Sequence, residues 1–199
     1  MLVLDHLAVI CADLDAGCAW VEAQLGVSLQ AGGRHDRYGT HNRLLGLDGG
    51  LYLEVIAPDH TVTPDGPRWF GLDHAPAHPR LGNWICQASR LGGFADIAGP
   101  AVDLRRGDLN WRITVPEDGS LPLGGGFPTL IKWGADVTHP AAALVPSGLR
   151  LTQLRVLTPD AGLVTGHCGP MDPRVVVEEA DTCALEAVFQ TPSGLVVLS

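Results

Sequence analysis

The order in which apolar periodicities follow one another constrains the fold of this chain more than any other feature. Residues 2–10 alternate as a strand does, and an apolar stripe with the helical period follows over residues 14–25. Two further alternating segments, 40–47 and 51–57, flank an Asp-Gly-Gly turn that is typical of a hairpin. With a weak strand near residues 28–30, this stretch predicts a β-α-β-β-β module.

The same order returns, imperfectly, in the middle of the chain. Strands are predicted near residues 83–88, 110–115 and 127–133, with a helix near residues 90–98 after the first of them. Alternating segments in the tail predict further strands over residues 149–157, 170–178, 185–189 and 195–199.

We therefore expect an α+β fold with an internal duplication. A first module covers residues 1–58, an aperiodic connection 59–80, a second module 81–145, and a C-terminal β-rich half-module 146–199.

Charge and cysteine content exclude several classes of protein. The 199 residues carry a formal net charge of -9, and the 13 basic residues form no cluster along the sequence, so we expect no nucleic-acid partner. No run of about 18 apolar residues occurs, so we expect no membrane partner. The five cysteines are widely spaced and form no Cys-x-x-Cys pair, which favours free thiols and a cytoplasmic location.

Three stretches resemble the glyoxalase-like domain family of the vicinal-oxygen-chelate superfamily, over roughly residues 3–160. They are Leu4-Asp-His-Leu-Ala-Val with Asp13-Leu-Asp, Gly39-Thr-His-Asn-Arg-Leu-Leu-Gly-Leu with Leu51-Tyr-Leu-Glu-Val-Ile-Ala, and Phe127-Pro-Thr-Leu-Ile-Lys-Trp with His139-Pro. The resemblance implies paired βαβββ modules whose curled mixed sheets enclose a pocket. It also implies a divalent metal held by the first and last strands of both modules, and a substrate that chelates it through two neighbouring oxygens.

His6 and Glu54 are the sharpest candidates for catalysis and for metal ligation. They lie on the predicted first and last strands of the first module, and their nitrogen and oxygen donors suit Fe, Mn, Ni, Co or Zn. The alternative is a His–Glu hydrogen bond that lines a pocket without a metal. In the second module Asn83 stands opposite His6, and Thr129, Ile131 and Lys132 lie near the position opposite Glu54. The metal ligands of the second module are therefore missing, and we expect the cofactor to be none rather than a divalent metal.

Polar and aromatic side chains where strands begin or end are candidates for substrate binding. An arginine or lysine can hold an anionic group, and a tryptophan can form a pocket wall. Trp69 and Phe70, in the connection, can cover the pocket, whereas His35 is expected in a solvent-facing loop. The substrate-binding candidates are His41, Asn42, Arg43, Lys132, Trp133 and His139.

The resemblance and these residues together favour a glyoxalase-like enzyme of the lyase, isomerase or dioxygenase type. It would act on a small oxygenated or anionic substrate, with or without a metal as Lewis acid. The alternative is a metal-free protein that binds a small molecule, as resistance proteins of the same superfamily do. Fold alone does not separate the two. The sequence leaves the oligomeric state open, with a homodimer as one option.

Overall fold

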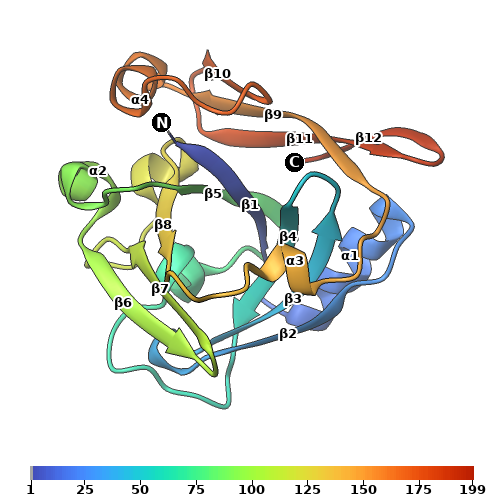
Figure 1. Cartoon of the computed structure of the whole chain (residues 1–199), viewed down its shortest axis with the longest axis horizontal. Coiled ribbons are helices and arrows are strands. Elements are labelled where there is room, and N and C mark those ends of the chain that lie inside the picture. Colours follow the sequence, from blue (N-terminus) through green and yellow to red (C-terminus); the bar gives the residue numbers. More distant parts are fainter. Residues whose placement is uncertain (1) are drawn as a thin grey trace.

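The structure, a computed structural model, describes residues 2–199. It has the expected α+β architecture, with one curled eight-stranded sheet and a separate four-stranded sheet (Figure 1). The strands are β1 (Val3–Ile10), β2 (Gln30–His35), β3 (Thr40–Leu47), β4 (Leu51–Pro58), β5 (Arg80–Gln87), β6 (Ala101–Arg106), β7 (Leu109–Thr114), β8 (Thr129–Trp133), β9 (Arg150–Thr158), β10 (Val175–Glu179), β11 (Ala184–Thr191) and β12 (Gly194–Leu198). The α-helices are α1 (Leu14–Leu25), α2 (Ala95–Ala98), α3 (Pro140–Ala143) and α4 (Ala161–Cys168), and the 3-10 turns are η1 (Asp36–Tyr38), η2 (Trp69–His74), η3 (Gly92–Phe94) and η4 (Pro122–Gly125).

The large sheet consists of two similar halves joined at its centre. Its strand order is β2-β3-β4-β1-β5-β8-β7-β6. The first strand of each half pairs in parallel with the fourth, β1 with β4 and β5 with β8, while β1 and β5 pair antiparallel across the centre. This is the paired βαβββ order that the sequence predicts. The sheet curls so that its edge strands, β2 and β6, both lie in the lower part of Figure 1.

Helix α1 forms over the residues that the sequence predicts, and a capping residue at each end sets its length. Asp13 caps its N-terminus by accepting a hydrogen bond from the backbone N–H of Ala16 at 2.8 Å. Gly26 ends it in the left-handed conformation, with φ 72°. The stripe that includes Leu14 and Val21 is buried against the outer face of the sheet.

The curled sheet separates two hydrophobic clusters. Its outer face packs against α1 and the four-stranded sheet, in a cluster that contains Leu7 and Phe189. Its inner face encloses a second cluster, in which Ala8, Ile56 and Ile131 meet residues of the connection. The inner cluster matters for function because it surrounds the few polar side chains buried inside the barrel.

One predicted helix is shorter in the structure, and two elements of the structure were not predicted. The helix expected over residues 90–98 is reduced to η3 and the single turn α2, because Gly92, Gly93 and Pro100 leave few residues for a helix. Strand β6 was not predicted, because its apolar alternation is limited to Val102 and Leu104 and it ends in two adjacent arginines. The tail forms the four-stranded sheet in the order β10-β9-β11-β12, with the unpredicted α4 between β9 and β10. The boundaries proposed for the modules stay predictions.

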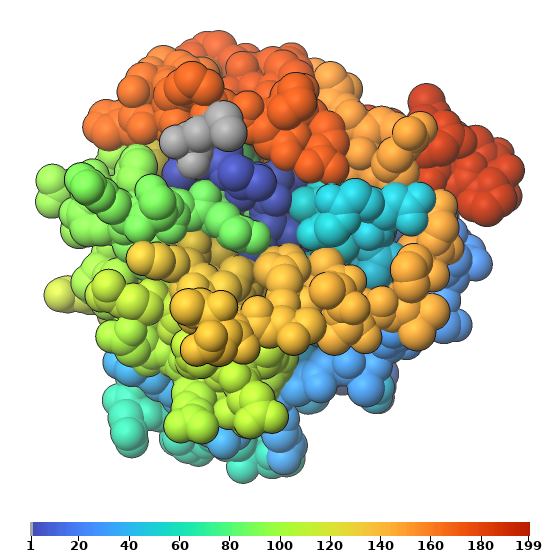
Figure 2. Space-filling model, viewed as in Figure 1, coloured from blue at the N-terminus to red at the C-terminus, as the bar shows by residue number. Residues whose placement is uncertain are grey.

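A strap over residues 134–149 leads from β8 to β9 and crosses the face of the molecule seen in Figure 2. Gln30 fastens it through two hydrogen bonds with the backbone of Val145, at 2.8 and 2.9 Å. The Ser147 hydroxyl donates to the Gly46 carbonyl at 2.6 Å. The strap thereby holds His139 over the N-terminal end of β1.

Within residues 2–199, no helix is long and apolar enough to cross a membrane. The five cysteines are all free thiols.

Candidate functional site

A β-bulge in β1 places two consecutive polar residues on the inner face of the barrel. The pairing of β1 with β5 shifts register between Leu4 and His6. Leu4 and Leu7 both pack in the outer cluster, so Asp5 and His6 both face inward. Simple alternation predicts the opposite face for Asp5 and puts Leu4 on the face of His6. The prediction was wrong for these two residues because the bulge changes the parity of the strand.

Asp5 is the fully buried centre of a hydrogen-bond network. Its Oδ1 accepts from His6 Nδ1 at 2.5 Å. Its Oδ2 accepts from Gln87 Nε2 at 2.7 Å, and from Trp133 Nε1 and His139 Nε2 at 2.9 Å each. Burial raises the pKa of Asp5, but the hydrogen bonds and charges of His139 and His6 outweigh burial, so that the pKa lies well below its ordinary value. Asp5 is therefore a carboxylate, and it fixes the proton of His6 on Nδ1.

Glu54 on β4 is held by a side chain of the neighbouring strand β3. Its Oε1 accepts from the Asn42 amide at 2.5 Å, and the amide oxygen of Asn42 accepts from the backbone N–H of Gly33 at 2.7 Å. This second bond fixes the orientation of the amide. The close approach of β2 needs glycine, since a Cβ on Gly32 would lie 2.2 Å from the Asn42 amide oxygen.

The free atoms of His6 and Glu54 face one another inside the barrel. His6 Nε2 lies 3.8 Å from Glu54 Oε2, which is too long for a direct hydrogen bond. The His6 ring stacks on Tyr52 with centroids 4.2 Å apart. In the neutral ring, Asp5 holds the one proton on Nδ1, and Nε2 then presents a lone pair. The pair can therefore accept and return a proton on an atom placed between them.

The remaining interior is almost filled by aromatic side chains. A cavity of about 40 Å³ is left beside His6 and Glu54. Trp69 and Phe70 of η2 form part of its wall, as the cover predicted from the sequence would, and Trp69 stacks between Tyr38 and Phe70 at 4.5 and 4.8 Å. Phe70 adopts φ 58°, a strained conformation for a residue with a Cβ, which places its ring in this stack.

The second half of the sheet carries a neutral pair where the first carries His6 and Glu54. Glu54 pairs with the residue two positions after His6, and Thr129 pairs with the residue two positions after Asn83. Aligning His6 with Asn83 therefore also aligns Glu54 with Thr129. The Asn83 amide donates to the Thr129 hydroxyl at 2.9 Å, and both side chains are buried.

These four positions do not fit a tightly held divalent metal. Only His6 and Glu54 offer donors of the usual kind, and Asn83 and Thr129 satisfy each other. Across residues 2–199, no group of three or more His, Cys, Asp or Glu side chains is placed to hold a metal ion.

The structure brings only some of the predicted substrate-binding residues to this interior. Asn42, Trp133 and His139 belong to the networks around Glu54 and Asp5. Arg43 is exposed on the other face of β3 and lines a hollow beside α1, and His41 shares that outer face. The expected convergence of Arg43 with His6 and Glu54 is therefore wrong.

Lys132 also lies outside the interior. It is exposed on β8 and lines an outer hollow with Asn110 and Asp103, so it is no counter-charge for Glu54. Side chains alternate between the two faces of a strand, so the neighbours of Arg43 on β3 and of Lys132 on β8 point inward. The inward-pointing residues are Asn42, Ile131 and Trp133.

Several polar and aromatic residues of the interior were not recognised in the sequence as candidates, Trp111 on β7 among them. Asp5 was hidden by the bulge, and Gln87 and Tyr52 read as ordinary strand residues. His35 was expected in a solvent-facing loop, but it ends β2, lines the interior cavity and contacts Trp69 edge-on at 4.9 Å. The adjacent Gly32 and Gly33 are the signal that could have revealed the close approach of β2 to Asn42.

The chain is similar to a known family over most of its length. A family model described as a glyoxalase-like domain matches residues 4–168. A search among curated proteins finds no match. Among solved structures, a methylmalonyl-CoA epimerase from Streptomyces coelicolor, in complex with 2-nitronate-propionyl-CoA, is 20% identical with a TM-score of 0.43, covering 66% of this chain and 97% of that chain. The methylmalonyl-CoA epimerase from Mycobacterium tuberculosis is 22% identical with a TM-score of 0.40, covering 65% and 85%.

Proposed function

The chain belongs to the glyoxalase-like domain family, and from this premise we propose that it is a small-molecule enzyme of the isomerase or lyase kind whose proton carriers are His6 and Glu54. The observation that carries the proposal is the pair of free atoms, His6 Nε2 and Glu54 Oε2, which lie 3.8 Å apart on buried side chains that line a small cavity. Each belongs to a side chain that a dedicated partner orients, Asp5 for His6 and Asn42 for Glu54.

The chemistry that suits this pair is proton transfer at a carbon next to a carbonyl. His6 Nε2 removes the proton, and the Asp5 carboxylate stabilises the imidazolium that forms. In a hydroxy-ketone, the Glu54 carboxylate accepts the hydroxyl proton and passes it to the carbonyl oxygen, and the His6 imidazolium returns its proton to the former carbonyl carbon. Asn42 keeps the Glu54 carboxylate turned toward His6. The substrate is therefore a small oxygenated molecule such as a hydroxy-ketone or an enolisable acyl compound.

The residues of this site carry out the proton transfers themselves. Superfamily members often use a divalent ion as a Lewis acid, but the residues at the four usual positions here supply two donors. Gln87, Trp133 and His139 instead share the charge of Asp5 and keep it in place beneath His6.

A second candidate is a metal-free protein that binds a small molecule without reaction. The aromatic walls of the interior, Tyr52, Trp111 and Trp133 among them, favour it. The two candidates differ in one observable property, because only the enzyme exchanges a substrate proton with solvent.

The test is an exchange assay in deuterated water. The full chain is incubated with hydroxyacetone, pyruvate and related small carbonyl compounds, and loss of the C–H signal next to the carbonyl is followed by proton NMR. We expect exchange that His6→Gln and Glu54→Gln each abolish and that Arg43→Gln, on the outer face, leaves unchanged. Saturable binding of these compounds without exchange would favour the binding protein.

A further inference from the structure

Four arginines gather in one hollow at the seam where the curled sheet nearly closes. The edge strands β2 and β6 meet there, and Arg106 Nη1 lies 3.2 Å from His35 Nε2 across the seam. The hollow has a volume of about 280 Å³. We call this cavity the arginine hollow, and its arginines are Arg34, Arg37, Arg105 and Arg106. They come from two segments far apart in the sequence, so no basic cluster is visible along the chain.

Most of this positive charge is uncompensated. Arg34 pairs with Asp59 at 2.7 Å. Within residues 2–199, Arg37, Arg105 and Arg106 form no ion pair with a carboxylate. Asp36 is the one acidic residue that lines the arginine hollow. In a chain with a net charge of -9, this local excess of positive charge is unusual and favours an anionic ligand.

His35, which also lines the arginine hollow, is neutral and leaves the positive charge of the arginines unchanged. Burial, and then the charge of Arg106, lower the pKa of His35 to about 3. The neutral ring accepts a hydrogen bond from Arg106 through Nε2, while Nδ1 faces the Thr40 hydroxyl at 3.2 Å. Arg106 is therefore held in a fixed, half-buried position by a neutral partner, and it keeps its full charge for a ligand.

The arginine hollow adjoins the interior site. His35 and Trp111 line both the arginine hollow and the cavity that contains His6 and Glu54. A molecule bound at the arginines can therefore reach the proton carriers if these two side chains move apart.

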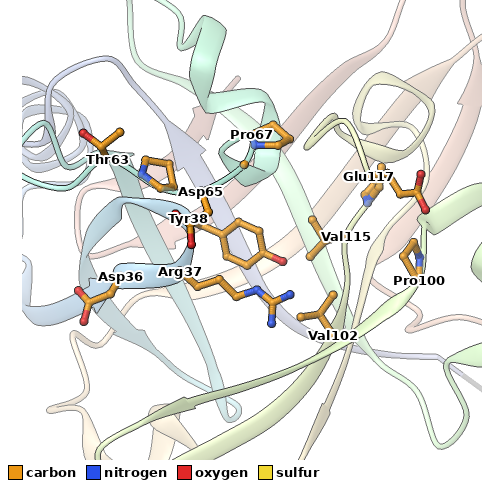
Figure 3. Close-up of a pocket in the computed structure, with 13 residues that line it drawn as sticks. Asp36, Arg37, Tyr38, Thr63, Asp65, Pro67, Pro100, Val102, Val115 and Glu117 are labelled. Atoms are coloured by element: carbon orange, nitrogen blue, oxygen red, sulfur yellow. The ribbon is translucent and has the colours of Figure 1, made fainter.

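A larger hollow of about 600 Å³ lies beside the arginine hollow and shares Asp36, Arg37 and Tyr38 with it. Figure 3 shows the Arg37 side chain and the Tyr38 ring extending toward Val102 and Val115. This second hollow is also lined by Asp65 and Glu117. Its additional carboxylates repel an anion, so the anionic group belongs among the arginines.

We propose that the arginine hollow binds the terminal oxyanion, a phosphate or a carboxylate, of the small molecule whose carbonyl end reacts at His6 and Glu54. This rests on the proposed function for the reacting end, whereas the oxyanion site stands on the arginines alone. Guanidinium groups bind both kinds of oxyanion through paired hydrogen bonds.

The test is a calorimetric titration of the full chain with butyl phosphate, pentanoate and butanol. We expect saturable binding of at least one of the two anions and none of butanol, and the tighter anion names the class of oxyanion. A double variant, Arg105→Gln with Arg106→Gln, should weaken binding about tenfold or more, since a charge-assisted hydrogen bond contributes at least that much. The matched control is Arg112→Gln with Arg150→Gln, which removes the same charge from exposed positions outside the arginine hollow.

Absence of saturable binding by both anions would overturn the proposal, as would an equal loss in the control. If the double variant does not fold, the exposed Arg37→Gln replaces it, and it should likewise weaken anion binding. His6→Gln separates the two proposals, because it should abolish proton exchange and keep anion binding. Anion binding without exchange in the wild-type chain would leave the oxyanion site intact and overturn the proposed function alone.

Discussion

The side chains of Asp5 and His6, consecutive in β1, point to the same face of the strand and are joined by a 2.5 Å hydrogen bond. Neighbours in a regular strand point to opposite faces, so this arrangement exists only because of the bulge. The bulge also brings Asp5 within reach of Gln87, Trp133 and His139. The bulge thus places Asp5 where its carboxylate orients His6, the candidate base.

Asp5→Asn should impair catalysis without removing the His6 ring. The variant loses the charge that stabilises the His6 imidazolium, and residues that orient a functional histidine typically contribute about 10- to 100-fold. We expect kcat of the exchange reaction to fall by about that factor with a smaller change in KM. The ¹⁵N shifts of His6 should also lose the preference for a proton on Nδ1. Unchanged shifts together with unchanged kcat would show that Asp5 does not act through His6.

His35 should make the free energy of unfolding depend on pH. The pKa of His35 is about 3 in the folded chain and about 6.5 in the unfolded chain. Between these two pH values the unfolded chain binds a proton at His35 and the folded chain does not. Its contribution to stability is present above pH 6.5 and is lost as the pH falls toward 3. His35→Gln should therefore flatten the decline in urea-measured stability over this window, and the exposed His60→Gln should not. Equal slopes in the wild type and His35→Gln would contradict the assignment.

Asn42→Leu should destabilise the fold by about 2 kcal/mol, because it leaves the Gly33 N–H and the Glu54 carboxylate without their buried partner. The neighbouring Arg43→Leu lies on the exposed face, and a change within about 0.5 kcal/mol is expected there. Urea unfolding of both variants measures the difference. Similar values for the two would mean that the Asn42 bonds contribute little.

The protein purified without an affinity tag or chelators should contain well below about one equivalent of a divalent metal, since a tight site needs three or four ligands. Elemental analysis of Fe, Mn, Ni, Co and Zn measures this. About one equivalent of any of them, lost on His6→Ala, would restore the metalloenzyme interpretation.

The sequence predicts most of the fold because apolar alternation specifies the central strands. Strands β1, β3, β4, β5, β7 and β8 and helix α1 lie close to their predicted ranges. The edge strands are less visible: β2 contains Gly32 and Gly33, and the apolar face of β6 is limited to Val102 and Leu104 before its two arginines. Edge strands are held by pairing on one side only, and their sequences are correspondingly less constrained.

For the site, the sequence predicts His6 and Glu54 on the first and last strands of the first module and Asn42 as a substrate-binding candidate, and these three meet inside the barrel. It does not predict Asp5, because a bulge depends on the pairing with β5 rather than on local periodicity. It also misplaces Arg43 and Lys132, whose chemistry suits a ligand but whose register puts them outside. The arginine hollow is assembled by the closure of the sheet, which no local pattern reveals.

The central claim is that His6 and Glu54 act as one proton-transfer unit, and a double-mutant cycle on the deuterium-exchange rate tests it most directly. Wild type, His6→Gln, Glu54→Gln and the double variant are compared on the same carbonyl substrate. Groups that act together are strongly non-additive. We predict that each single variant loses nearly all exchange and that the double variant is no slower than the slower single one. Full exchange in either single variant, or losses that multiply in the double variant, would contradict the claim.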